Sequence, residues 1–253
     1  MGSMCRLLAK ASAQQEPPSL ELLHAPHSLR HQAERARFPV GFGPHDDGSG
    51  VAWLQSGAIR LEKCGASEAW GESFQQVVHS MQTTALIAHN RKASPGLEVN
   101  ARLSHPYVLG YRGEEVAFCH NGGIETFMTE AKDRNITDSL IFFEHLVARV
   151  GELTVEDLKG FLAESSEIWE FSSLNGLLLT KTGIFAWRCY QEVENSTWDR
   201  ERYCSLYLHK SPERVCIASE PLDQRQGWVS VPNRTLLHAQ LRSDTVELSM
   251  TPL

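Results

Sequence analysis

The chain has 253 residues, a hydrophobic fraction of 42% and a charged fraction of 22%, as is typical of a globular protein with a sizeable core. Its formal net charge of −7 argues against a protein that coats nucleic acid. No apolar run approaches the ~20 residues of a membrane-spanning helix, so we expect neither a nucleic-acid nor a membrane partner.

Six cysteines are spread along the chain, and no two have the Cys-x-x-Cys spacing of a zinc or redox motif. The start of the chain lacks the charged segment, apolar stretch and small-residue cleavage site of a secretory signal. We therefore expect a reducing, cytoplasmic location in which the cysteines stay as thiols.

Cys5 stands close to the start of the chain, after Gly2-Ser3 and a second methionine, Met4. We expect residues 1–3 to be a cloning remnant and Met4 to be the native initiator, whose removal would make Cys5 the first residue. A terminal cysteine offers a thiol nucleophile and an α-amine with a pKa of about 8 that can accept a proton. One residue would then supply both nucleophile and base. The alternative is a small buried cysteine with a structural role.

The first half of the chain predicts short strands and helices separated by turns. In chain order they are a strand over 5–10, helical patches over 20–23 and 29–35, a loop over 41–50, a hairpin of strands 51–54 and 59–63, a helix over 70–82 and a strand over 84–88.

The second half continues with helices and then changes to strands. The expected elements are a strand over 116–119, helices over 138–150 and 155–164, and strands over 177–180, 184–189, 203–209, 215–219, 228–231 and 235–240. Because strands dominate both ends and helices lie between them, the pattern predicts an α+β fold with largely antiparallel sheets. No composition shift marks a boundary, so we expect a single domain over residues 4–253.

Three junctions between strands or helices and loops carry groups suited to chemistry. Arg91 follows an apolar strand, and its planar fork suits a carboxylate; the alternative is an ordinary surface arginine. Asn121-Gly122 ends another strand and offers amide and backbone N–H donors for an oxyanion; the alternative is a plain hairpin turn. Asp138 opens a predicted helix, where it can bind an ammonium group or simply stabilise the helix start.

Five short motifs stand in order along the chain: Cys5-Arg6-Leu7-Leu8, His89-Asn90-Arg91, His105-Pro106-Tyr107, His120-Asn121-Gly122 and Thr137-Asp138-Ser139. Three further segments, called branch segments below, are 28–33, 47–53 and Ala218-Ser219-Glu220-Pro221-Leu222. The five motifs resemble the class II glutamine amidotransferase domain of the N-terminal nucleophile hydrolases. The branch segments resemble its stand-alone branch, which includes YafJ-like proteins and the ergothioneine-pathway amidohydrolase. The resemblance covers nearly the whole chain, about residues 4–240.

The resemblance implies a four-layer αββα sandwich with two mainly antiparallel sheets. It also implies that Cys5 attacks the γ-carbonyl of a glutamine-like amide through a glutamyl thioester, with its α-amine as base. Asn121 and the Gly122 N–H would hold the oxyanion. Arg91 would bind the substrate α-carboxylate and Asp138 its α-ammonium. His89 and His120 lie in the matching motifs and are expected to help bind the substrate.

Two departures concern the site. Lys92 stands where several synthase-linked relatives have an aromatic residue, which affects the substrate pocket rather than the chemistry. With Met1–Met4 retained, the Cys5 nitrogen is an amide and cannot act as a base, so we expect little turnover before processing.

Other sites are less well supported. Cys119 and His120 are adjacent on a strand and should point to opposite faces, which disfavours a catalytic dyad. His24, His27 and His31 have helical spacing, but Pro26 interrupts the helix, so surface histidines are expected rather than a metal site. We expect no cofactor.

Two classes of function remain open. The first is an enzyme that hydrolyses glutamine, with ammonia passing to a separate synthase, or a γ-glutamyl conjugate. The second is a non-catalytic subunit of the same fold that binds an amino acid or scaffolds a partner.

Overall fold

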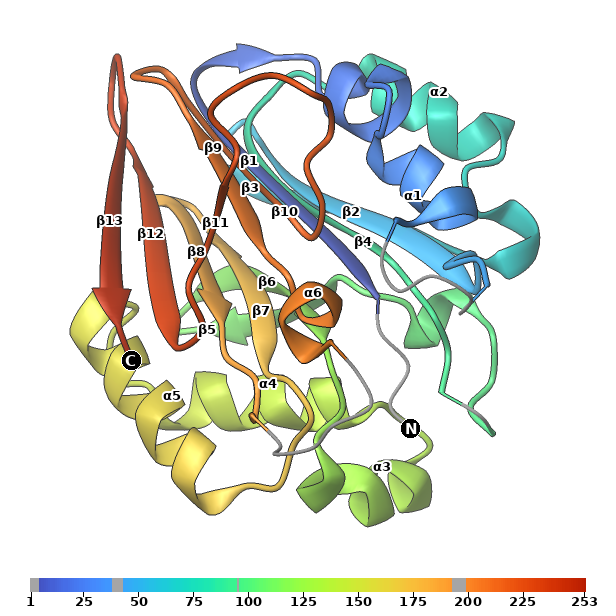
Figure 1. Ribbon diagram of the computed structural model, residues 1–253, viewed down its shortest axis with the longest axis vertical. Coiled ribbons are helices and arrows are strands. Elements are labelled where there is room, and N and C mark those ends of the chain that lie inside the picture. Colours follow the sequence, from blue (N-terminus) through green and yellow to red (C-terminus); the bar gives the residue numbers. More distant parts are fainter. Residues whose placement is uncertain (1–4, 38–42, 95, 193–198) are drawn as a thin grey trace.

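The computed structural model describes residues 5–37, 43–94, 96–192 and 199–253. Two antiparallel sheets face each other, and helices cover the outer face of each (Figure 1). This is the four-layer αββα sandwich that the family resemblance implies, and it confirms the α+β fold with antiparallel sheets that the residue pattern predicts.

The first sheet has seven strands among the described residues, with β1 and β4 near its centre. In spatial order they are β11 (Val229–Ser230), β9 (Tyr207–Lys210), β10 (Arg214–Ala218), β1 (Arg6–Glu16), β4 (Thr83–Asn90), β2 (Gly48–Gln55) and β3 (Ala58–Gly65).

The second sheet has six strands in the described part of the chain, and two of them, β6 and β7, pack against β4 of the first sheet. In spatial order they are β13 (Val246–Pro252), β12 (Thr235–Leu241), β8 (Gly183–Arg188), β7 (Asn175–Thr180), β6 (Glu114–Asn121) and β5 (Tyr107–Tyr111).

The helices divide between the two outer faces. The first sheet is covered by η1 (Leu20–His24), α1 (Leu29–Arg35) and α2 (Glu72–Ser80), and the second by α3 (Met128–Arg134), α4 (Asp138–Arg149) and α5 (Val155–Ile168). Single turns are η2 (Ala66–Glu68), η3 (Ala101–Leu103), η4 (Glu125–Phe127) and α6 (Arg200–Tyr203). No helix of the described residues is long and apolar enough to cross a membrane.

Alternating side chains explain why β1 is buried on both faces. Leu7, Ala9 and Ala11 point into the apolar core between the sheets, whereas Leu8 packs under the helices of the outer layer. Cys5 precedes the strand by one residue and shares the inner side with Leu7. The alternation therefore directs the Cys5 side chain into the space between the two sheets.

Most expected elements are confirmed, with different ends; β5, α3 and β13 were not predicted, and neither were the single turns η2, η3, η4 and α6. The strand predicted over 203–209 is wrong in its first half, because α6 ends at Tyr203 and β9 begins at Tyr207. The Cys204 carbonyl instead accepts side-chain hydrogen bonds from Asn175 and Arg188, both at 2.9 Å. The predicted loop over 41–50 ends earlier, since β2 begins at Gly48; residues 41 and 42 lie outside the described residues.

Candidate active site

The site lies where β1 begins and where β4 and β6 end. Arg6 pairs with Asn90 across the first sheet, and Asn121 pairs with Asn175 across the second. Cys5, Arg91 and Gly122 therefore extend from three strands at the same end of the sandwich, and α4 supplies Asp138 from the covering layer. The structure thus brings together residues from four segments that are far apart in the sequence.

Both the backbone nitrogen and the sulfur of Cys5 have hydrogen-bond partners. Its backbone nitrogen lies 2.5 Å from Asn121 Oδ1, and the backbone N–H of Lys92 donates to the Cys5 Sγ at 3.4 Å. Burial raises the pKa of the Cys5 thiol to about 11, although the Lys92 N–H and nearby Arg91 act in the opposite direction. The thiol is therefore protonated near neutral pH, and it needs a base to become a nucleophile.

Asn121 ends β6 next to the Cys5 nitrogen, and Gly122 follows it in the lining of the same cavity as Cys5. The Asn121 Nδ2 is buried and has no hydrogen-bond partner among the described residues. Gly122 has a φ of +152°, and a Cβ at this position would overlap the carbonyl oxygen of Ser173. An unpartnered amide donor next to a nucleophile is the arrangement that an oxyanion site requires.

Arg91 and Asp138 supply opposite charges to the same cavity. Arg91 is 3% exposed, its Nη1 donates to the Glu98 carbonyl at 2.8 Å, and its Nη2 has no partner in the described part of the chain. Asp138 is half-buried at the first turn of α4, and its Oδ2 accepts from the Ile124 N–H at 2.7 Å. A cation and an anion fixed across one cavity match the two charged groups of an α-amino acid.

Three buried histidines lie near this charge pair. Burial lowers the pKa of His89 to about 3, holds that of His105 well below its usual value and lowers that of His120. All three are therefore neutral near pH 7.

His120 is fixed by two protein groups. Its Nε2 lies 3.0 Å from the Ser173 carbonyl, which can only accept, so the ring donates there and its Nδ1 accepts from the Ser139 hydroxyl at 2.8 Å. His120 lines the cavity, but both ring nitrogens are occupied. His89 lies behind it, with Nε2 3.2 Å from the His120 carbonyl, and is not among the cavity-lining residues.

His105 lines the cavity, and neither ring nitrogen has a partner among the described residues. Its ring packs against His89 and Tyr107, with centroids 4.4 and 4.6 Å away. Gly50 permits this position, because a Cβ there would overlap the His105 carbonyl. The sequence assigned no role to His105; the His105-Pro106-Tyr107 motif was its only signal.

The cavity has a volume of about 30 Å³ and is lined by Cys5, Arg91, Lys92, His105, His120, Asp138 and their neighbours. Such a space holds roughly two or three water molecules, which is less than a glutamyl group needs. Entry of a ligand of that size therefore requires the surrounding side chains to move apart.

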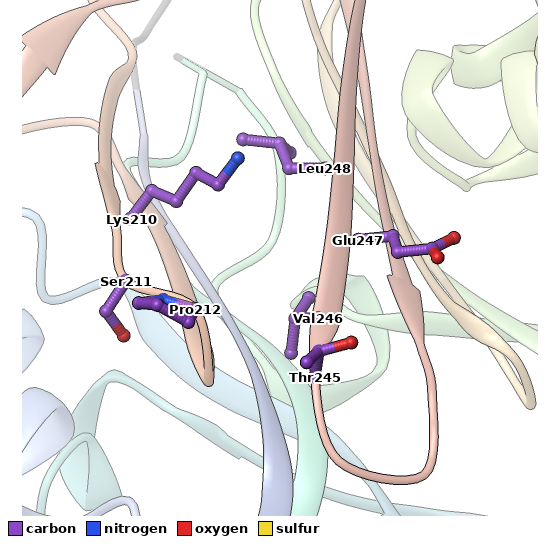
Figure 2. A pocket seen from close by; sticks show the side chains of 7 residues that line it. All are labelled: Lys210, Ser211, Pro212, Thr245, Val246, Glu247 and Leu248. Atoms are coloured by element: carbon purple, nitrogen blue, oxygen red, sulfur yellow. The ribbon is translucent and has the colours of Figure 1, made fainter.

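A larger cavity of about 620 Å³ lies at the turns that join β9 to β10 and β12 to β13. Figure 2 shows Lys210 reaching toward Leu248 across it, while Glu247 points away from it. Val246 N–H donates to the Pro212 carbonyl at 3.2 Å and joins the two turns. The residues that line this larger cavity include no cysteine, and their one carboxylate, Glu247, points away from it.

The other candidate sites differ from Cys5 in their surroundings. Cys119 lies in the apolar core between the sheets, where burial raises its pKa well above the usual value. No group of three metal-ligating side chains occurs in the residues that the structure describes. His27 is buried rather than on the surface as expected, and its Nε2 contacts the Glu220 carboxylate at 2.5 Å.

Comparison with known proteins agrees with the fold and the motifs. Residues 4–189 match the family model of the class-II glutamine amidotransferases. The chain therefore belongs to this family of enzymes.

Relatives that match nearly the whole chain include proteins named as hydrolases. It is 26% identical over 250 residues to gamma-glutamyl-hercynylcysteine sulfoxide hydrolase of Mycobacterium tuberculosis, covering 96% of each chain. It is 23% identical over 238 residues to the protein of the same name from Mycolicibacterium smegmatis, covering 92% of this chain and 95% of the relative.

Solved structures show the same fold. A glutamine aminotransferase class-II domain protein of Silicibacter pomeroyi superimposes with a TM-score of 0.59 at 15% identity, covering 97% of this chain and 98% of the other. Glutamine phosphoribosylpyrophosphate amidotransferase of B. subtilis superimposes with a TM-score of 0.62 at 14% identity. The chain spans about half the length of that enzyme, covering 49% of it.

Proposed function

We propose that residues 4–253 form one catalytic domain that hydrolyses γ-glutamyl amide bonds through a thioester on Cys5. The observation that carries the proposal is the position of Cys5 between Asn121 and the cavity that holds Arg91 and Asp138. Nucleophile, oxyanion donor and head-group charges are thus available in one place.

The first half of the reaction forms the thioester. The Cys5 sulfur attacks the γ-carbonyl carbon, and the thiol proton passes to the Cys5 α-amine directly or through water. Asn121 Nδ2 and the Gly122 N–H stabilise the oxyanion. The α-ammonium then protonates the leaving amine as the C–N bond breaks.

The second half releases the acid. Water attacks the thioester carbon and gives its proton to the α-amine, and the C–S bond breaks to regenerate the thiol and glutamate. Because burial raises the thiol pKa to about 11, the base is required in the first step. The α-amine exists only when the peptide bond before Cys5 has been cleaved, so we propose that processing activates the enzyme.

Arg91 and Asp138 are proposed to bind the α-carboxylate and α-ammonium of the glutamyl group. Arg91 Nη2, which lacks a partner among the described residues, supports the first role. His120 is proposed to support this head-group site, with both nitrogens held by Ser139 and Ser173, and His89 to support His120 from behind.

The substrate is proposed to be glutamine or a γ-glutamyl conjugate, the class to which the names of the mycobacterial relatives refer. We further propose a cytoplasmic location, which is consistent with the absence of disulfides among the six cysteines.

Glutamate release tests the proposal. Protein that begins at Cys5 is assayed with glutamine, γ-glutamylglycine and α-glutamylglycine, beside its Cys5→Ala variant. We expect release from one or both γ-linked substrates, none from the α-linked peptide and none from Cys5→Ala. Preference for glutamine would favour ammonia transfer to a separate synthase. Glutamate binding without release from any γ-linked substrate would contradict the proposal.

A further inference from the structure

A buried ion pair lies directly beside Cys5 and is not used by the proposed chemistry. Arg6 is the first residue of β1 and points to the opposite side of the sheet from Cys5, under the outer helices. Arg6 is 1% exposed, and its Nε lies 3.0 Å from the Glu220 carboxylate, which is fully buried. Arg6 Nη1 also donates to the Cys5 carbonyl oxygen at 2.8 Å.

Glu220 is itself fixed on its second oxygen. Glu220 Oε2 lies 2.5 Å from His27 Nε2 and accepts from the Arg37 N–H at 2.9 Å. Burial alone would raise the pKa of Glu220, but the contact with His27 and the charge of Arg6 outweigh burial and leave the pKa lowered. Glu220 therefore stays ionised and keeps its charge next to Arg6.

Two of the branch segments, 28–33 and Ala218-Ser219-Glu220-Pro221-Leu222, meet at this ion pair, and the proposed chemistry gives them no role. Ser219 forms two hydrogen bonds with Leu7. The Ser219 N–H donates to the Leu7 carbonyl, and the Leu7 N–H donates to the Ser219 hydroxyl, both at 2.9 Å. Gln32 of the other segment donates to the His27 carbonyl at 3.0 Å, and the His27 N–H donates to the Leu222 carbonyl at 2.8 Å. Both segments thus hold Glu220 against the start of β1.

Cys5 is consequently restrained at both ends of its backbone. Asn121 contacts its nitrogen from the second sheet, and Arg6 binds its carbonyl oxygen from the outer layer. We propose that Arg6 and Glu220 are positioning residues: Glu220 holds the Arg6 guanidinium on the Cys5 carbonyl, so that the nitrogen and thiol of Cys5 stay aligned with Asn121 and the cavity.

The pair also affects the charge beside the catalytic nitrogen. The charged groups near Cys5 are Arg6, Arg91 and Lys92 as cations and Asp138 as an anion, and the nearby histidines His89, His105 and His120 are neutral. Glu220 compensates one of these cations, Arg6. Without Glu220, the uncompensated Arg6 guanidinium would disfavour protonation of the Cys5 α-amine. The acid limb of the pH profile, where the rate falls because the α-amine takes up a proton, would then move to lower pH.

The same face of β1 provides a control. Lys10 lies four residues after Arg6 and forms a buried ion pair with Glu21 at 3.0 Å, with side-chain exposures of 3% and 4%. Glu21→Gln removes a buried carboxylate while Lys10 keeps Glu16 at 2.9 Å as its second partner. This pair has no contact with Cys5 among those that the structure shows, so its loss should affect stability alone.

The inference rests on the proposed thioester chemistry, and the test compares Glu220→Gln with Glu21→Gln in protein beginning at Cys5. Active sites are titrated with a glutamine-mimicking diazoketone, and kcat per titrated site, KM and the pH profile of kcat/KM are measured on the γ-linked substrate that the wild-type protein prefers. For Glu220→Gln we expect kcat per site to fall by about 10- to 100-fold with KM within about 3-fold. The acid limb should move down by about half a pH unit or more. Glu21→Gln should keep all three wild-type values.

Wild-type kcat per site and an unmoved acid limb in Glu220→Gln would overturn the positioning role. If Glu220→Gln does not fold, Arg6→Lys tests the positioning role instead. Lysine keeps the charge and the contact with Glu220, but it has no second nitrogen to donate to the Cys5 carbonyl. We then expect kcat per site to fall about 10-fold with the acid limb unmoved, and wild-type kcat would refute the role. Failure of wild-type protein on every γ-linked substrate would instead contradict the proposed function.

Discussion

Asn121 uses the two ends of one amide for two purposes. Its oxygen faces the Cys5 nitrogen at 2.5 Å, while its nitrogen is buried and unpartnered within the described residues. A developing oxyanion would supply the partner that this donor lacks. We therefore propose that one side chain both orients the base and stabilises the intermediate.

Asn121→Asp separates these two roles, because aspartate keeps an acceptor for Cys5 and loses the donor for the oxyanion. We expect kcat for glutamate release to fall by about 10²- to 10³-fold, the usual effect of removing an oxyanion donor. Binding of the product glutamate, measured by calorimetry, should stay within about 3-fold because Arg91 and Asp138 are unchanged. A kcat within 3-fold of the wild-type value would contradict the oxyanion role.

At the scale of elements, the start of α4 joins the helix layer to the cavity. Thr137 caps this helix by accepting from the Leu140 N–H at 3.2 Å, and its hydroxyl also contacts the Tyr107 hydroxyl at 2.9 Å. The next residue is Asp138, which faces the cavity. The cap therefore fixes the position of the proposed ammonium-binding carboxylate.

Thr137→Ala and Thr154→Ala form a matched pair, since Thr154 caps α5 far from the cavity by accepting from the Asp157 N–H at 3.1 Å. Each substitution should lower the free energy of unfolding by about 1 kcal/mol, as measured by urea denaturation. Only Thr137→Ala should raise KM for the γ-linked substrate, by about 3- to 10-fold. Equal KM values in the two variants would show that the cap does not position Asp138.

Local sequence patterns predicted the buried strands and the capped helices. One example is α5, which begins directly after its capping residue Thr154. They failed where an element has little local signal. β13 is an edge strand whose residues are mostly exposed, and β5 is an edge strand with three half-buried residues. The residues before β9 look like a strand, yet the Cys204 carbonyl accepts from the side chains of Asn175 and Arg188, which only the tertiary structure reveals.

At the scale of the whole molecule, local motifs predicted some features of the site, and tertiary contacts determine the others. The motifs around Arg91, Asn121 and Asp138 identified groups that do converge on Cys5. Sequence could not show that the His105 backbone packs on Gly50 or that Ser173 holds His120, because these contacts join segments about 50 residues apart. Nor did it indicate that His27 is buried against Glu220.

The buried histidines make the stability of the molecule depend on pH. His89, with a pKa of about 3 in the fold, and His105 both have pKa values below the 6.5 of an unfolded chain. As the pH falls below 6.5, the unfolded chain takes up protons that the folded chain does not, so the folded state is progressively destabilised. The loss for His89 is fully developed only near pH 3.

Urea denaturation between pH 7 and 4 measures this effect. The free energy of unfolding should decrease with falling pH, by up to about 1.4 kcal/mol per pH unit for each such histidine. His89→Gln should have a shallower slope than the wild-type protein, whatever its stability at pH 7. An identical slope in the variant would show that His89 takes up its proton equally in both states.

The central claim is that an exposed Cys5 terminus forms a glutamine-shaped nucleophilic site, and covalent labelling measures it most directly. Intact mass is recorded after incubation with a glutamine-mimicking diazoketone for protein beginning at Cys5, its Cys5→Ala variant and protein that retains Met1–Met4. We predict one adduct on the first, none on the second and much slower labelling of the third. No adduct on protein beginning at Cys5, or equal labelling rates with Met1–Met4 retained, would contradict it.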